Sequence, residues 1–181
     1  MVSVTPDELR GWLDVLEPDR RAHSLEVGRK VQSVQTLVGQ GLREDLVTAG
    51  TLHDIGYGYP DTGFHPLDGA RLLAREGFSP VVCSLVLRHS ASMIEAEERG
   101  IDLAVYGDFA VNDDLAAAHQ LVWWADMTTG PTGETVTVED RLDEIATRYG
   151  PEDLVTRFIR RARPILMASC QAPGGSIQVS A

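Results

Sequence analysis

The chain has 181 residues, which is enough for one domain with a well-buried core and too few for two ordinary domains. Its formal net charge of -11 argues against a nucleic-acid polymer as the partner, because phosphates would be repelled over most of the surface. The charge is compatible with a small anionic substrate held at a metal ion, since a bound cation dominates the local field.

Further features of the composition indicate a cytoplasmic protein. No apolar run approaches the length that crosses a bilayer, so we expect no membrane partner. Residues 1–10 lead directly into a helix start and lack the charged-then-apolar layout of a secretory signal. The two cysteines, Cys83 and Cys170, lie far apart in the sequence, which fits a reducing compartment.

The first half of the chain carries the signals of helices joined by short breaks. Thr5 is a helix cap followed by proline and two acidic residues, which is typical of a helix start. Glycines in residues 56–63 predict a loop. We expect four helices here. The first ends near Leu16, and the second runs from Pro18 to Val38 with one apolar face. The third covers residues 44–55 and is buried, and the fourth runs from Pro66 to Glu76.

The second half continues the helical pattern with weaker signals in its middle. Residues 95–99 predict a short exposed helix, and residues 100–109 have no clear period. The longer helices expected here cover 80–89, 112–126, 137–149 and 151–169, with a polar loop over 128–135. The low aromatic content of 6% also favours helices over strands. We therefore predict one all-helical domain of seven or so helices over residues 1–170, followed by a disordered tail at 171–181.

His53 and Asp54 are the sharpest chemical feature of the sequence. They stand together at the end of the buried helix, just before Gly56 turns the chain outward. A buried imidazole beside a buried carboxylate is costly without a partner, and a divalent cation supplies one. The dipeptide alone is also compatible with a helix C-cap, in which the imidazole lies near the terminal carbonyls.

Two more polar residues face the predicted core. His23 lies on the same side of its helix as Val27 and Val34, and Asp126 ends a helix whose apolar positions point inward. One shared metal would satisfy both. Imidazole and carboxylate ligands suit iron, manganese, zinc or magnesium, and the lack of paired cysteines argues against a thiolate zinc site.

The order His23, His53-Asp54, Asp126 resembles the signature of the HD superfamily of metal-dependent phosphohydrolases. The flanking residues 20–24 (RRAHS) and 51–56 (TLHDIG) are also similar to the family's motifs, and the resemblance spans residues 18–129. It implies an all-helical fold, catalysis at His53 and Asp54, and two divalent ions, with iron or manganese favoured over zinc or magnesium. Some members of the superfamily bind two metal ions. By resemblance to them, His23, His53, Asp54 and Asp126 would bind the first ion, and Asp54, His65 and His89 would bind the second.

For His65 and His89 the alternatives are a helix cap and a surface residue, and His119 is interpreted as structural. Tyr57 stands where many relatives carry a lysine that can meet a substrate phosphate, and Arg88-His89 stands where many carry two histidines. The residues considered as substrate contacts are Arg20, Arg29, Tyr57 and Arg88, although each arginine could equally be a solvated surface charge.

Three functions fit this site. A pair of divalent cations suits hydrolysis of a phosphomonoester or nucleotide, which is our first hypothesis. The resemblance also includes oxygenases with iron in both positions that cleave carbon–carbon or carbon–phosphorus bonds, and these form the second hypothesis. The third is a non-catalytic binding module in which the metal is a structural pin.

Overall fold

The computed structural model describes residues 5–112 and 114–171, and these residues form nine α-helices joined by short 3-10 turns, without a β-strand. The predicted all-helical fold is confirmed. The tail predicted as disordered lies, from residue 172 on, outside the described residues. The helices are α1 Pro6–Trp12, α2 Pro18–Val34, α3 Arg43–Leu52, α4 His65–Arg75, α5 Pro80–Leu87, α6 Ser92–Arg99, α7 Ala116–Met127, α8 Val138–Tyr149 and α9 Leu154–Ser169.

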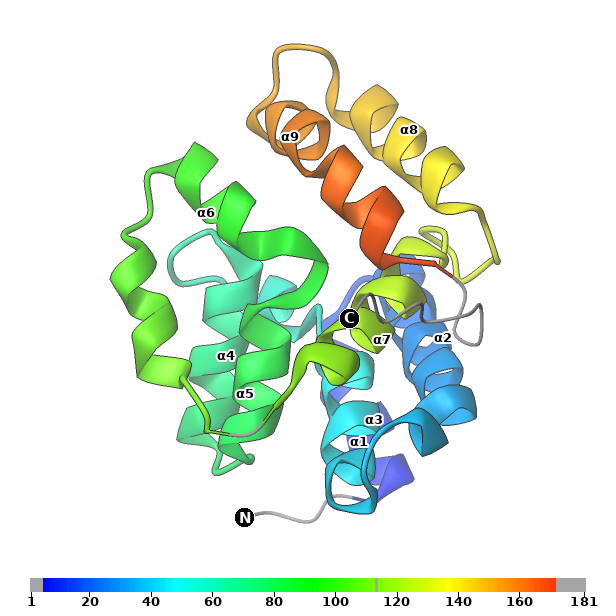
Figure 1. The fold of residues 1–181 in the computed structure, drawn as a ribbon, viewed down its shortest axis with the longest axis vertical. Coiled ribbons are helices and arrows are strands. Elements are labelled where there is room, and N and C mark those ends of the chain that lie inside the picture. Colours follow the sequence, from blue (N-terminus) through cyan, green and yellow to red (C-terminus); the bar gives the residue numbers. More distant parts are fainter. Residues whose placement is uncertain (1–4, 113, 172–181) are drawn as a thin grey trace, which may run out of the picture.

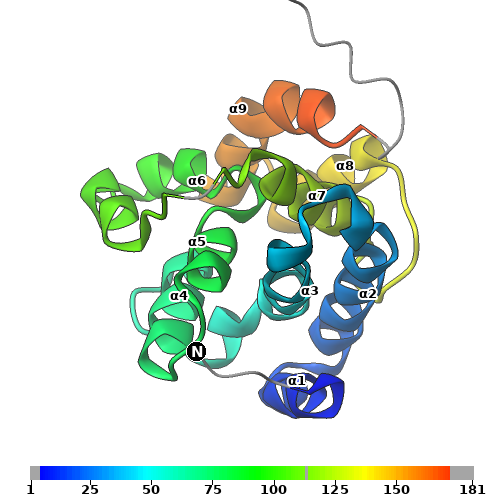
Figure 2. The same ribbon diagram turned by 60° about the horizontal axis from the view of Figure 1, so that its bottom comes forward.

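The helices associate as neighbouring pairs around α7. Helices α2 and α3 pack together, as do α4 and α5, and α8 and α9 form a hairpin at the top of Figure 1. Figure 2 shows α3 between α2 and the α4–α5 pair, and α3 contacts α2, α5 and α7. The main apolar core lies among these helices, while a second apolar cluster joins α7 to the α8–α9 hairpin.

Local capping signals explain several helix starts. Thr5 caps α1, as predicted: it accepts a hydrogen bond from the Glu8 amide, and the Glu8 carboxylate in turn accepts one from the Thr5 amide. Thr137 caps α8 as expected. The last helix begins at Leu154 and not at residue 151, because the Asp153 side chain caps it by accepting from the Val155 amide.

The sequence interpretation was wrong about the exposure of the short helix α6. Ser92, Glu95 and Ala96 are buried there, because these positions share one helix face and α6 packs against α9. The run of acidic residues at 95, 97 and 98 suggested a solvated helix, but only the last two positions of that run face away from the core.

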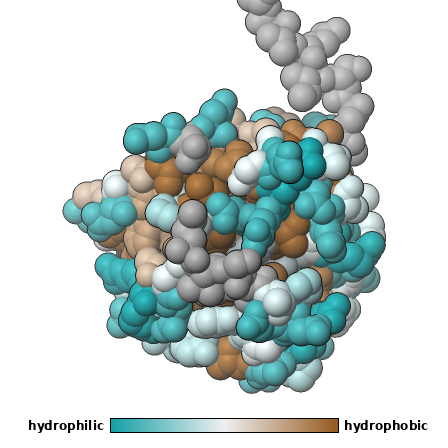
Figure 3. Space-filling model, turned by 90° about the horizontal axis from the view of Figure 1, so that it is seen from below, coloured by the Kyte–Doolittle hydropathy of each residue, from teal (hydrophilic) through white to brown (hydrophobic). Residues whose placement is uncertain are grey.

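Seen from below, the surface carries hydrophilic side chains around most of its rim, with apolar side chains visible between them (Figure 3). Within residues 5–112 and 114–171, no helix is both long enough and apolar enough to span a bilayer.

Candidate metal centre

The six predicted metal ligands come from five separate parts of the fold and meet at one place. Ligand atoms of five of them form two groups, and within each group the atoms lie within 4.8 Å of one another. The first group contains His23 from α2 with His53 and Asp54 from the end of α3; the second contains Asp54, His65 and His89. Asp54 belongs to both groups, which is the position that the two-metal assignment requires.

Asp126, near the end of α7, joins the first group. Its Oδ1 lies 3.1 Å from His23 Nε2 and 3.7 Å from His53 Nε2. Its Oδ2 accepts a hydrogen bond from the Ser90 hydroxyl. One oxygen is therefore held by the protein while the other faces the imidazoles.

Three of the imidazoles are oriented by backbone carbonyls. The Nδ1 atoms of His23, His53 and His89 lie 3.0, 2.9 and 2.6 Å from carbonyl oxygens of the chain. A carbonyl only accepts, so each Nδ1 must carry the hydrogen, and each Nε2 is left toward the centre of the cluster. This is the arrangement by which proteins hold metal-binding histidines in one tautomer.

The interior of the cluster fits a cation. His53 is fully buried, and its Nε2 has no hydrogen-bond partner among the described residues. His23 Nε2 faces the Asp126 carboxylate, so a neutral His23 with hydrogen on Nδ1 would direct a lone pair at an anion. A divalent ion between these atoms would resolve both problems, because every one of the unmatched groups is an electron-pair donor.

The surroundings of the cluster keep its two carboxylates and His89 in the states that bind metal. Burial raises the pKa of Asp54, but the neighbouring His53 and Arg20 outweigh it, and the pKa lies well below the usual value. Burial also raises the pKa of Asp126, but the adjacent His23, with His53 nearby, outweighs it, and the pKa lies well below the usual value. Burial, with His65 and His53 nearby, lowers the pKa of His89 to about 4. At neutral pH the carboxylates are ionised and His89 is neutral.

Backbone contacts set the spacing between the two ligand groups. The chain leaves Asp54 through a 3-10 turn, Ile55–Gly58, that touches the start of α4. A Cβ atom on Gly56 would lie 2.0 Å from the His65 carbonyl oxygen and 2.7 Å from the Gly69 nitrogen. Only glycine permits this approach, which brings His65 Nε2 to 3.3 Å from Asp54 Oδ1.

The segment after α5 is strained. Ser90 and Ala91 are consecutive non-glycine residues with positive φ, at 47° and 59°. Such conformations cost energy and persist only where the surrounding structure maintains them. The turn places His89 in the second ligand group and directs the Ser90 hydroxyl at Asp126, which joins the first group. The strained backbone therefore positions residues of both ligand groups.

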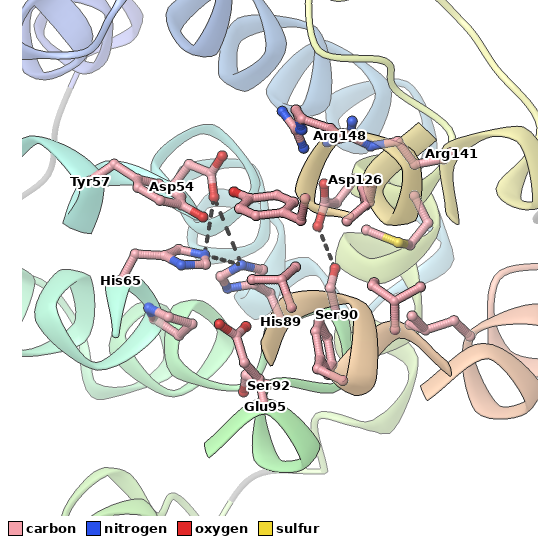
Figure 4. A pocket seen from close by; sticks show the side chains of 18 of the residues that line it. Asp54, Tyr57, His65, His89, Ser90, Ser92, Glu95, Asp126, Arg141 and Arg148 are labelled. Atoms are coloured by element: carbon pink, nitrogen blue, oxygen red, sulfur yellow. Dashed lines mark hydrogen bonds and ion pairs between the residues drawn. The ribbon is translucent and has the colours of Figure 1, made fainter. Parts of the chain in front are cut away.

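A cavity of about 160 Å³ opens beside the cluster (Figure 4). Two of the predicted substrate contacts line it. The Arg20 guanidinium pairs with Asp54 and lies 3.6 Å from the centre of the Tyr57 ring, and the Tyr57 ring stacks on His65 at 4.0 Å. Arg20 therefore brings a positive charge to the rim, and Tyr57 covers one face of a predicted ligand.

The other two predicted substrate contacts lie elsewhere, and this corrects the expectation. Arg29 is exposed and pairs with Glu26 at 2.5 Å, one turn away on α2. Arg88 points away from the cluster and donates to Ser84 Oγ and to the carbonyl oxygens of Tyr106 and Phe109. Arg29 is thus the solvated surface charge that the alternative interpretation allowed, whereas Arg88 is partly buried and has a structural role that neither interpretation predicted.

His119 also lies apart from the cluster, as the structural interpretation implied. It borders a separate cavity that contains Arg88, and its Nδ1 is buried without a hydrogen-bond partner within the described residues. Burial and the nearby Arg88 lower its pKa to about 4, so the ring is neutral at pH 7.

Replacing Arg88 with alanine tests its structural role. The change removes one hydrogen bond to Ser84 within α5 and two that tie α5 to the turn over Leu103–Phe109. We therefore expect the free energy of unfolding to fall by about 2–4 kcal/mol with metal content unchanged. Denaturant titration and elemental analysis measure the two quantities. Arg10→Ala, which removes an exposed pair with Asp7, should change neither. Loss of metal from a folded Arg88→Ala protein would contradict this role.

The cavity also contains charged residues that the sequence analysis missed. Glu95 is buried beside Arg99, and Arg141 and Arg148 enter from α8. A signal was present for Arg141, because it stands four residues before the buried Ile145 and so shares its helix face.

Comparison with known protein families matches the HD domain to residues 20–145, which is well over half of the chain and contains all six predicted ligands. The comparisons found no matching curated protein and no matching solved structure. Because the family match covers most of the chain, including the cluster described above, the protein belongs to the HD-domain family.

Proposed function

We propose that the protein is a metal-dependent phosphohydrolase that acts on a small phosphorylated metabolite. The observation that carries this proposal is the pair of ligand groups that share Asp54. The family match supports the reaction class, and the donor set favours iron or manganese, with zinc or magnesium as alternatives. Two divalent ions in these positions would activate a water molecule and stabilise the attacking and leaving oxygens of a phosphoryl transfer.

The protein's own residues prepare the site for an anion. Asp54 and Asp126 would contribute two negative charges to a centre with two bound dications, so the cavity would remain positive when both ions are present. Arg20 adds positive charge at the rim, fixed in place by Asp54 and by the Tyr57 ring. The phenol ring stacked on His65 limits the access of water to that side of the cluster. A small phosphate ester would therefore be drawn to the cluster in spite of the acidic surface.

Tyr57 favours a second candidate, a di-iron oxygenase. A phenol replaces the expected cation and stacks directly on a predicted ligand of the second metal position. The third hypothesis, a metal that only pins the fold, does not explain the open cavity beside the cluster.

A paired assay separates the two reaction classes. Loaded with manganese under nitrogen, the protein should release phosphate from at least one member of a panel of phosphomonoesters and nucleotides. Loaded with ferrous iron in air, it should consume no dioxygen beyond that of a protein-free control in the presence of the same compounds. Activity that requires both iron and dioxygen would refute the hydrolase proposal and establish the oxygenase.

A further inference from the structure

Arg141 is a buried cation with an unused hydrogen-bond donor. It lies on α8, its side chain is 8% exposed, and its Nη1 donates to Glu144 at 2.7 Å. Its Nε is buried and has no hydrogen-bond partner within the described residues. A buried donor on a charged group is costly to leave unpaired. We therefore expect the Arg141 Nε to donate to an acceptor on a bound ligand.

The guanidinium belongs to the cavity wall next to the metal cluster. Arg141 lines the same cavity as Asp54, His89 and Asp126. Figure 4 shows Arg141 and Arg148 on the side of the cavity where Asp126 lies. An acceptor that reached Arg141 would therefore also be close to the groups that hold the metal.

The charges near Arg141 leave it free for an anion. Glu144 is shared, since one of its carboxylate oxygens accepts from Arg141 at 2.7 Å and the other forms an ion pair with Arg148 Nε at 3.2 Å. Besides the Thr132 hydrogen bond, the Arg141 charge helps to lower the pKa of Glu134, but within the described residues neither carboxylate accepts from the Arg141 Nε, which stays available to an anion. Arg99, another cation of the wall, is instead neutralised by the buried Glu95 at 2.7 Å.

The wall beyond Arg141 is apolar. It is formed by side chains of α7, α8 and α9: Met127, Ile145, Val155, Phe158, Ile159 and Leu166. The volume of about 160 Å³ is close to the roughly 150 Å³ of an apolar cavity that accepts benzene, and well below the ~300 Å³ at which pockets for larger ligands begin. The apolar wall suits a compact apolar group.

We propose that Arg141 binds the anionic group of the substrate, and that this substrate is a small phosphomonoester with a compact apolar group, such as an aryl or branched alkyl phosphate. The phosphoryl group would lie between the cluster and Arg141, and the apolar group against Ile145 and Phe158. Hydrolysis would break the ester P–O bond with one water, giving inorganic phosphate and an apolar alcohol. The reaction rests on the function proposed above, whereas the binding preference does not.

Calorimetric titration of the manganese-loaded protein tests the binding preference without catalysis. The probes are inorganic phosphate and phenylphosphonate, whose C–P bond is not an ester. We expect phenylphosphonate to bind about tenfold more tightly or better. Arg141→Gln should weaken both probes by about tenfold or more, since a hydrogen bond from a charged donor is lost. Phe158→Ala should weaken only phenylphosphonate.

The matched control is Arg163→Gln, which removes a cation paired with Asp143 in the same helical hairpin and outside the cavity. It should bind both probes as the unchanged protein does. Metal content and circular dichroism are recorded for each variant, so that lost binding is not confused with lost metal or fold. Arg141→Lys, which keeps the buried charge and with it the fold, should still weaken phosphate severalfold because the Nε donor is lost.

The outcomes separate this inference from the proposed reaction. Unchanged affinity for both probes in folded, metal-loaded Arg141→Gln, or in Arg141→Lys if the former does not fold, would overturn the role of Arg141. Equal affinity for phosphate and phenylphosphonate would overturn the apolar preference. If phenylphosphonate binds as expected but no member of the panel of phosphomonoesters and nucleotides, phenyl phosphate included, is hydrolysed, the hydrolase proposal fails and the anion site stands.

Discussion

Asp54→Ala is expected to strip metal from both positions and to reduce metal-dependent activity to background. Asp54 Oδ1 lies 3.3, 3.6 and 3.9 Å from the Nε2 atoms of His65, His53 and His89. No other side chain belongs to both ligand groups. The change removes the one anionic oxygen that both ions would share, and it also leaves Arg20 facing them without a counter-charge. Elemental analysis of protein purified without added metal measures the loss.

His65→Ala is the informative comparison, because His65 belongs to the second ligand group alone. We expect that variant to retain about one ion per chain in the first position. Two ions per chain in Asp54→Ala would contradict the shared-ligand assignment, and two ions in His65→Ala would exclude His65 as a ligand. Circular dichroism on both variants distinguishes loss of a ligand from loss of fold.

The parts of the centre that could be predicted are those governed by local sequence. Helical periodicity places His23 on the core side of α2, and the break at Gly56 places His53 and Asp54 at the end of α3. These features depend on residues within a few positions of one another. The resemblance to a known family then supplied His65 and His89, which periodicity alone would have left as a cap and a surface residue.

The rest depends on contacts between distant segments. Arg88 is satisfied by carbonyl groups 18 and 21 residues away, in a 3-10 turn whose sequence has no clear period. Arg141 faces the cavity because the α8–α9 hairpin folds back over α7. Ser90 reaches Asp126 through two left-handed residues that no propensity predicts for serine and alanine. Such positions are set by tertiary packing, which overrides the local signal.

Gly56→Ala is expected to have the second large effect, on stability and on the second metal position together. The added methyl would lie 2.0 Å from the His65 carbonyl oxygen and 2.7 Å from the Gly69 nitrogen, and both are backbone atoms of α4 that cannot rotate away. The helix must move as a unit or the variant must unfold. Relief of such an overlap costs about 3 kcal/mol, which corresponds to a fall in Tm of roughly 6–12 °C for a chain of this size.

The same movement would separate His65 from Asp54, so folded Gly56→Ala should hold about one ion per chain. Gly11→Ala is the matched control, since Gly11 lies in α1, no atom lies within 4 Å of its added methyl, and alanine favours a helix by about 0.5–1 kcal/mol. That variant should be slightly more stable and fully metal-loaded. A wild-type Tm and two ions per chain in Gly56→Ala would show that the turn and α4 are not in backbone contact. The link between the two ligand groups would then have to come from the side chains alone.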